Sequence, residues 1–292
     1  MIAPPIERAF DAADELGEGA TWDVARQRLI SVDIMRGRVH LFDPHTSTAQ
    51  TIEVGQPVGA AVPRRDGALT LAVRDGFATL DPATRAMTFI AYVDLDRPDL
   101  RMNDGTCDAA GRFWAGTMAI DERPGAGALY RLDPDGSTHT MVTDVGISNG
   151  IDWSPEGRTM YYVDSLTQRL DRFDFDLASG TIANRRTLVT IDPVEGSPDG
   201  LTVDAEGAIW LALWGGSSIR RYLPDGTLDF VLPVPVTYPT TCAFGGTDLG
   251  DLYITSATIR MNAEERRRQP LAGSILRCRP GVTGRPAPAF GG

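Results

Sequence analysis

The stretch Ser148-Asn149-Gly150-Ile151-Asp152-Trp153-Ser154-Pro155-Glu156-Gly157 decides the fold, because its plan occurs more than once in the chain. A polar residue opens the plan, a strand-like run follows, and a turn glycine stands eight positions after the opener. The stretches 102–111 and 197–207 repeat it, with Asn103 and Asp199 as openers. A unit that recurs in this way predicts a repeat architecture.

Comparable openers occur along the whole chain at a nearly constant interval. They are Glu18, Gly59, Asn103, Asn149, Asp199 and Thr241, spaced 41 to 50 residues apart. A period of about 40 to 50 residues is typical of the blades of a β-propeller. Each unit reads as four short strands separated by turns rich in Pro, Gly and Asp. We therefore expect an all-β protein, a six-bladed β-propeller with four antiparallel strands per blade, forming one domain over residues 1–292.

The residues ahead of the first opener predict how the ring closes. Ile6 to Ala12 precede the first unit, and we expect this N-terminal segment to supply a strand that completes the last blade. One helical turn is expected over Asn262 to Arg268, inside a long loop of the last unit. The rest of the chain shows no sustained helical period.

Composition narrows the possible functions. A formal net charge of −11 gives an acidic surface that repels phosphate backbones, so we expect no nucleic-acid partner. No run approaches the roughly 18 apolar residues of a spanning helix, and Met1 to Arg8 lack the features of a signal peptide, so no membrane partner is expected. Cys107, Cys242 and Cys278 show no C-x-x-C spacing and predict core residues in a reducing compartment. We expect a cytoplasmic monomer.

Two common catalytic patterns do not fit the chain. Residues 146–150 match G-x-S-x-G around Ser148, but a strand follows instead of a helix, and His40, His45 and His139 all precede the serine. The histidines also lack the H-E-x-x-H spacing of a zinc site. Neither a serine triad nor a His-ligated zinc is therefore expected.

The openers instead predict a polar site on the propeller axis. The first strand of each blade lines the central channel, so Glu18, Asn103, Asn149 and Asp199 would converge there. Two carboxylates and two amides need partners when they are buried together, and either a bound cation or channel water would supply them. An all-oxygen ligand set favours Ca²⁺, Mg²⁺ or Mn²⁺; Zn²⁺ and Fe²⁺ remain alternatives because oxygen-rich sites accept several ions.

Seven motifs in register resemble one known family. They are Gly17 to Trp22, Arg101 to Gly105, Gly116 to Met118, Ile147 to Ser154, Tyr161 to Ser165, Pro198 to Gly200 and Cys242 to Gly246. Together they resemble the SMP-30/gluconolactonase/regucalcin family from about residue 13 to residue 290. The resemblance implies a six-bladed propeller that carries one divalent metal ion and hydrolyses a sugar (aldono-) lactone to the aldonic acid.

The resemblance also implies roles for individual residues. Glu18, Asn149 and Asp199 match the metal ligands of the family, and Arg101 and Asn103 match its substrate-contacting residues. On residue type alone, Arg101 is also compatible with an ion pair at the surface.

A further acidic substrate contact of the family falls on Asp121, which is shorter than the Glu of some relatives. An acidic residue in such a loop is otherwise most often merely solvated.

Lactone hydrolysis defines what such a site must do. A divalent ion polarises the carbonyl and lowers the pKa of bound water, and Asp199 would act either as ligand and general base or as ligand alone.

Two other functions fit the same architecture. One is hydrolysis of organophosphates or other esters, which an apolar pocket would favour. The other is a non-catalytic calcium-binding propeller.

Overall fold

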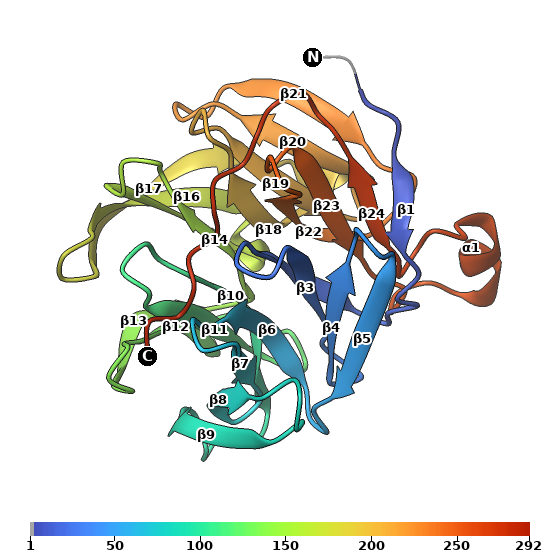
Figure 1. The fold of residues 1–292 in the computed structure, drawn as a ribbon. Coiled ribbons are helices and arrows are strands. Elements are labelled where there is room, and N and C mark those ends of the chain that lie inside the picture. The colour runs from blue at the N-terminus through green and yellow to red at the C-terminus, as the bar shows by residue number, and fades with distance from the viewer. Residues whose placement is uncertain (1–2) are drawn as a thin grey trace.

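The computed structural model describes residues 3–292, and strands dominate it (Figure 1). Six sheets of four antiparallel strands surround a central axis, which confirms the expected six-bladed β-propeller. The described residues contain one α-helix, α1 (Ala263–Arg268), and two short 3₁₀ turns, η1 (Ser165–Thr167) and η2 (Pro193–Glu195).

The first five blades follow one another in chain order. Blade 1 contains β2 (Gly17–Asp23), β3 (Arg28–Asp33), β4 (Arg38–Asp43) and β5 (Thr48–Glu53), and blade 2 contains β6 (Val58–Pro63), β7 (Leu69–Val73), β8 (Gly76–Leu80) and β9 (Met87–Tyr92). Blade 3 contains β10 (Leu100–Cys107), β11 (Phe113–Ala119), β12 (Gly127–Leu132) and β13 (Thr138–Val145). Blade 4 contains β14 (Ser148–Trp153), β15 (Thr159–Asp164), β16 (Arg169–Asp176) and β17 (Thr181–Thr190), and blade 5 contains β18 (Ser197–Val203), β19 (Ile209–Trp214), β20 (Ser218–Tyr222) and β21 (Leu228–Pro233).

Blade 6 is completed by the start of the chain, as the sequence predicts. Its strands are β22 (Pro239–Gly245), β23 (Asp251–Ser256), β24 (Ile275–Cys278) and β1 (Glu7–Phe10). Strand β1 pairs antiparallel with β24, with Glu7 opposite Arg277, and the two strands lie side by side in Figure 1. A ring closed by hydrogen bonding between the two ends of the chain leaves no gap between its first and last blades.

Apolar side chains fill the spaces between neighbouring blades. One buried cluster joins Ile30 and Val32 of blade 1 to Leu71 and Ala78 of blade 2. Clusters of the same kind occur around the ring, so each sheet is covered on both faces by its neighbours. The three cysteines are buried and free, in agreement with their expected place in the core.

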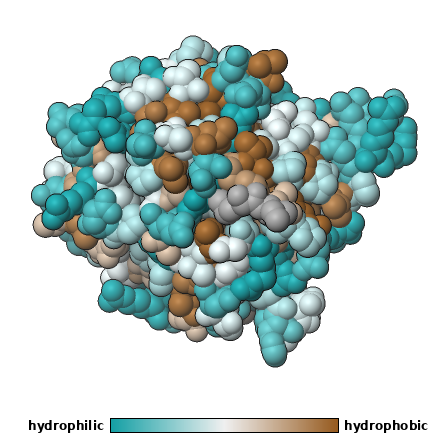
Figure 2. Space-filling model, turned by 90° about the horizontal axis from the view of Figure 1, so that it is seen from above, coloured by the Kyte–Doolittle hydropathy of each residue, from teal (hydrophilic) through white to brown (hydrophobic). Residues whose placement is uncertain are grey.

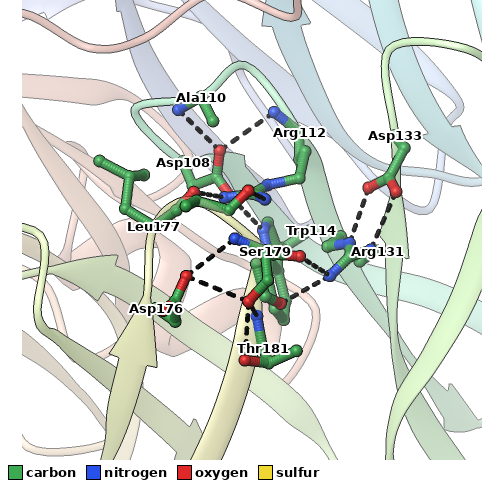
Figure 3. Close-up of polar contacts among 12 residues, drawn as sticks. Asp108, Ala110, Arg112, Trp114, Arg131, Asp133, Asp176, Leu177, Ser179 and Thr181 are labelled. Atoms are coloured by element: carbon green, nitrogen blue, oxygen red, sulfur yellow. Dashed lines mark hydrogen bonds and ion pairs between the residues drawn. The ribbon is translucent and has the colours of Figure 1, made fainter.

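A buried carboxylate anchors the turn between β10 and β11 (Figure 3). Asp108 accepts hydrogen bonds from the backbone N of Ala110 at 2.9 Å, from Nε of Arg112 at 2.6 Å and from Nε1 of Trp114 at 2.9 Å. The Asp108 side chain is fully buried and that of Arg112 nearly so. A buried ion pair is stable only when its remaining polar atoms also find partners.

Those partners come from the next blade. Nη2 of Arg112 donates to the carbonyl of Leu177 at 2.6 Å, and Nη1 of Arg131 donates to the carbonyl of Gly180 at 2.6 Å. Arg131 is held in turn by Asp133, at 2.7 and 2.9 Å. The two arginines of blade 3 therefore fix the β16–β17 hairpin of blade 4, as Figure 3 shows.

The C-terminal segment crosses one face of the ring. Residues 279–292 leave blade 6 and run over the face turned to the viewer in Figure 1. The carbonyl of Thr283 accepts from the backbone N of Ala205 in blade 5 at 2.9 Å, and the backbone N of Phe290 donates to the carbonyl of Pro63 in blade 2 at 2.8 Å. This segment therefore links blades that are not neighbours in the ring.

Helix α1 lies in the loop between β23 and β24, where the sequence predicts a helical turn. Asn262 caps it by accepting from the backbone N of Glu264 and Glu265, while the Glu265 side chain accepts from the backbone N of Asn262. The helix forms a hydrophilic projection at the right of Figure 2. Among residues 3–292 no helix is long and apolar enough to cross a membrane.

Candidate active site on the propeller axis

A bulge interrupts the first strand of every blade at its opener. The register with the second strand shifts between Glu18 and Thr21, Val58 and Ala60, Met102 and Gly105, Ser148 and Ile151, Pro198 and Leu201, and Pro239 and Cys242. A bulge bends the strand and redirects a side chain that would otherwise alternate between the two faces of the sheet. Because the first strands contact one another around the ring, the redirected side chains gather at the axis.

The gathered side chains form the floor of a cavity of about 300 Å³. Five polar residues line this floor: Glu18, Arg101, Asn103, Asn149 and Asp199. Each is at most 8% exposed. The structure therefore brings together, from blades 1, 3, 4 and 5, all the candidate metal-ligating residues and two of the three candidate substrate-contacting residues.

A second cavity, of about 210 Å³, occupies the opposite end of the channel beneath the C-terminal segment. Two charged residues that line this cavity, Arg285 and Asp152, form an ion pair, in which Nη2 of Arg285 donates to Oδ1 of Asp152 at 3.0 Å. Asp104 faces this cavity and accepts from the backbone N of Gly105. The bulge in β10 thus sends Asn103 to one end of the channel and Asp104 to the other.

Arg101 and Asn103 hold each other in place on the floor. Nη1 of Arg101 donates to Oδ1 of Asn103 at 2.7 Å and to the carbonyl of Met102 at 3.0 Å, and Nδ2 of Asn103 donates to the carbonyl of Ser148 at 2.7 Å. Burial lowers the pKa of Arg101 to about 10, so the guanidinium is still charged at neutral pH. Arg101 does not form a surface ion pair with Asp99, which pairs with neighbouring arginines instead.

Two oxygen atoms on the floor are buried without a hydrogen-bond donor. Nδ2 of Asn149 donates to Oγ of Ser165 at 3.0 Å, and that hydroxyl donates to the carbonyl of Pro198 at 2.7 Å. This chain of bonds orients the amide. Within residues 3–292, Oδ1 of Asn149 and Oδ1 of Asp199 have no hydrogen-bond partner. Buried polar atoms in native proteins nearly always have a partner, and either a cation or a water molecule on the axis would supply one to these two oxygens.

The surroundings of the carboxylates on the axis disfavour the ionised form of each of them. Burial and the negative charges of Asp199 and Asp104 raise the pKa of Glu18 well above its usual value. Burial and the charge of Asp104 likewise raise the pKa of Asp199 well above its usual value, and burial raises that of Asp104 to about 6. A divalent cation beside Glu18 and Asp199 would remove this penalty.

The donor set fits a hard cation. Glu18, Asn149 and Asp199 offer two carboxylates and one amide oxygen, the ligand types preferred by Ca²⁺, Mg²⁺ and Mn²⁺. No group of three or more His, Cys, Asp or Glu side chains in the described part of the chain is arranged to hold a metal. The candidate site differs from such a group because its third candidate ligand, Asn149, is an asparagine.

Asp121 does not reach the cavity. Its side chain is 63% exposed and accepts from Nη1 of Arg123 at 2.7 Å, so its position does not support the expected contact with substrate. The next residue, Glu122, lines the cavity and pairs with Arg260 from the opposite blade of the ring. The turn after β11 explains why Glu122 lines the cavity and Asp121 does not. Glu122 has a left-handed backbone conformation with φ of 60°, which points its side chain toward the cavity.

A serine triad is absent from the described residues. Ser148 is buried in β14, and its Oγ accepts from the hydroxyl of Tyr162 at 2.9 Å. His40 lies instead between Asp14 and Thr51, at 2.9 Å from each, and the other two histidines are exposed. None of the three histidines lines the axial cavity.

Fold and site together define the class: a six-bladed β-propeller with an arginine and an oxygen-rich ligand set buried on its axis. The family follows from comparison with known proteins. The model of the SMP-30/gluconolactonase/LRE-like region matches residues 16–258, and the chain belongs to this family.

Relatives of known name agree with this assignment. The chain is 37% identical to regucalcin of Xenopus laevis over the full length of both proteins. It is also 37% identical to the provisionally named sugar lactone lactonase YvrE of Bacillus subtilis, over 91% of each chain. Among solved structures, a calcium-binding regucalcin from Agrobacterium tumefaciens superposes with a TM-score of 0.94 at 29% identity, covering 98% of this chain and 97% of the other.

Proposed function

We propose that this protein is a metal-dependent lactonase that hydrolyses a sugar lactone to the aldonic acid. The observation that carries the proposal is the pair of buried oxygens without donors, on Asn149 and Asp199, in the same cavity as the Arg101 guanidinium. The family includes gluconolactonases, and one relative is named as a sugar lactone lactonase. We also propose that the protein acts as a monomer, because every residue of the site comes from one chain. The cytoplasm is the compartment that we propose for it.

Glu18, Asn149 and Asp199 would hold the ion, which is Ca²⁺, Mg²⁺, Mn²⁺, Zn²⁺ or Fe²⁺. When bound, a divalent ion polarises the lactone carbonyl and lowers the pKa of a water molecule. Three protein ligands leave positions open for substrate and water. The regucalcin relatives and a homologous structure described as a calcium-binding protein support a divalent ion as the cofactor.

The protein side chains would bind the lactone and move one proton. Asp199 would accept the proton of the attacking water at its carboxylate, which is the general-base role. Arg101, held by Asn103, offers fixed donors to the ring and hydroxyl oxygens of the substrate. We assign the acidic substrate contact to Glu122, because it lines the cavity and Asp121 does not.

The direct test is hydrolysis of a panel of aldonolactones, each measured with metal removed and with each of the five ions restored. Turnover that requires metal is the expected result. Metal binding without turnover of any lactone or ester would instead favour a calcium-binding propeller. Turnover of phosphotriesters or simple esters but not of lactones would favour the ester-hydrolase alternative.

Removal of metal should make stability depend on pH. The raised pKa values of Glu18, Asp104 and Asp199 mean that the metal-free fold binds more protons than the unfolded chain. Stability is then fully present at acidic pH and is lost as pH rises through the folded-state values. We expect the Tm of metal-free protein to fall as pH rises from about 4 through the folded-state pKa of Asp104, about 6, and added divalent ion to restore the Tm above that pH. A Tm that is constant or rises over this range would contradict the prediction, and Glu18→Gln should weaken both effects.

Gly150 permits the close approach of the strands that carry Asn149 and Asp199. A Cβ atom at Gly150 would lie 2.6 Å from the carbonyl oxygen of Asp199, so Gly150→Ala forces β14 and β18 apart. We expect kcat/KM to fall by roughly 10²-fold, because misplacement by about 1 Å has this effect. Lactone hydrolysis and Tm measure the change. Gly281→Ala has nothing within 4 Å of the added carbon, but its φ of 89° strains an alanine, so it should lower Tm while leaving kcat/KM unchanged. Equal activity of the two variants would show that the spacing is not critical.

A further inference from the structure

The wall of the axial cavity above its polar floor is apolar. In five of the six blades, the residue at the end of the second strand, or within three positions after it, is large, apolar and directed to the cavity. These residues, which we call the apolar collar, are Met35, Ile120, Leu166, Trp214 and Ile259. At this place blade 2 has Arg74 and Asp75, which pair with each other.

Part of the collar is exposed although it is apolar. Met35 is 41% exposed, Leu166 43% and Ile120 57%, and none of the three belongs to a buried cluster of the core. Scattered surface hydrophobics are ordinary, but hydrophobics gathered around the mouth of one cavity mark a binding surface. Packing therefore does not explain these three residues.

The two charged side chains at the rim of the cavity, Glu122 and Arg260, pair with each other. Glu122 of blade 3 and Arg260 of blade 6 form an ion pair, so the two charges at the rim offset each other, and the Glu122 carboxylate keeps acceptor positions for one substrate hydroxyl. The polar groups that bind a lactone are concentrated on the floor, around Arg101 and Asn103. A lactone with its carbonyl on the floor would thus place the far side of its ring against the collar.

We propose that the collar binds an apolar substituent, alkyl or aryl, carried by the lactone ring on the side away from its carbonyl. This inference rests on the proposed lactonase function. The substituent replaces water on Met35, Ile120 and Leu166, and burial of apolar surface is favourable. Each methylene buried in the transition-state complex should raise kcat/KM about fourfold until the collar is filled.

The test compares γ-lactones that carry a hydrogen, methyl, ethyl, propyl or butyl group on the ring carbon next to the ring oxygen. We expect kcat/KM to rise along the series. Leu166→Ser should reduce the ratio of kcat/KM for the butyl lactone to that for the unsubstituted one. Leu228→Ser is the matched control, because Leu228 is 45% exposed on the outer strand of blade 5 and does not line the cavity.

Binding of the corresponding γ-lactams, which resist hydrolysis, gives a readout that does not depend on turnover. Titration calorimetry should show Kd falling about fourfold per methylene in the native protein and less steeply in Leu166→Ser. A Kd and a kcat/KM that do not depend on chain length would overturn the collar proposal while leaving lactone hydrolysis intact. Absence of lactone turnover would overturn the proposed function, and the lactam series would still decide whether the collar binds apolar groups.

Discussion

Asp199→Asn is expected to lower kcat/KM for lactone hydrolysis by about 10³-fold or more. The asparagine is nearly isosteric and keeps one oxygen for a cation, but it carries no charge and cannot accept a proton from water. Loss of a positioned general base alone typically costs 10²- to 10⁴-fold. Weaker binding of the divalent ion adds to the loss, because Asp199 is one of only two carboxylates among the proposed ligands.

The measurement is steady-state kinetics at saturating metal, with the metal Kd determined separately by calorimetry. This separation shows how much of the loss comes from the base and how much from the ligand. Asp121→Asn is the matched control, because Asp121 is exposed outside the cavity, and it should change kcat/KM by less than about twofold. Retention of a tenth of the activity by Asp199→Asn would contradict the proposed base.

Asp108→Ala is expected to lower the free energy of unfolding by about 3 to 5 kcal/mol, the usual result of breaking a buried ion pair from one side. The change leaves the Arg112 guanidinium buried with one acceptor fewer and removes the acceptor of the Trp114 indole N–H. Because Arg112 also holds the hairpin of blade 4, the effect should reach the packing between two blades.

Denaturant unfolding followed by tryptophan fluorescence measures this loss. Asp174→Ala is the control, because it removes an exposed ion pair with Arg186 within blade 4. It should leave the denaturation midpoint nearly unchanged. Comparable midpoints for the two variants would show that the buried network does not stabilise the ring. Arg112→Met should also be destabilising, because it leaves the fully buried Asp108 carboxylate without its counter-ion.

Much of the fold could be predicted from the period of the chain. Openers such as Asn103, Asn149 and Asp199 recur with turn glycines eight positions later, and this period is long enough for four strands. The closing strand and the helix after Asn262 were also predictable, because each has a local signal in composition or capping. The convergence of polar openers on the axis follows from the ring itself.

Other parts of the site depend on geometry that local sequence does not encode. Glu122 lines the cavity because its backbone is left-handed, a conformation that glutamate rarely adopts and that no local signal predicts. Arg112 finds its acceptor 65 residues away, at Leu177, so the network between blades is visible only in three dimensions.

The apolar collar was equally hidden, because its members lie at different distances from the second strand, from Trp214 at the end of β19 to Ile259 three residues after β23. Only their common position at or just after the second strand of five blades unites them. The strand boundaries that define this position are the least certain part of a sequence-based prediction.

The pairing of β1 with β24 also sets the order in which the molecule can be completed. Glu7 is synthesised before its partner Arg277, which follows 270 residues later. Until then blade 6 lacks its outer strands, and β1 remains an unpaired strand tethered to a growing ring. Contacts this distant in sequence slow folding, and unpaired strand edges promote association between chains. The strand that seals the finished ring therefore makes the nascent chain vulnerable to aggregation until its last strand is made.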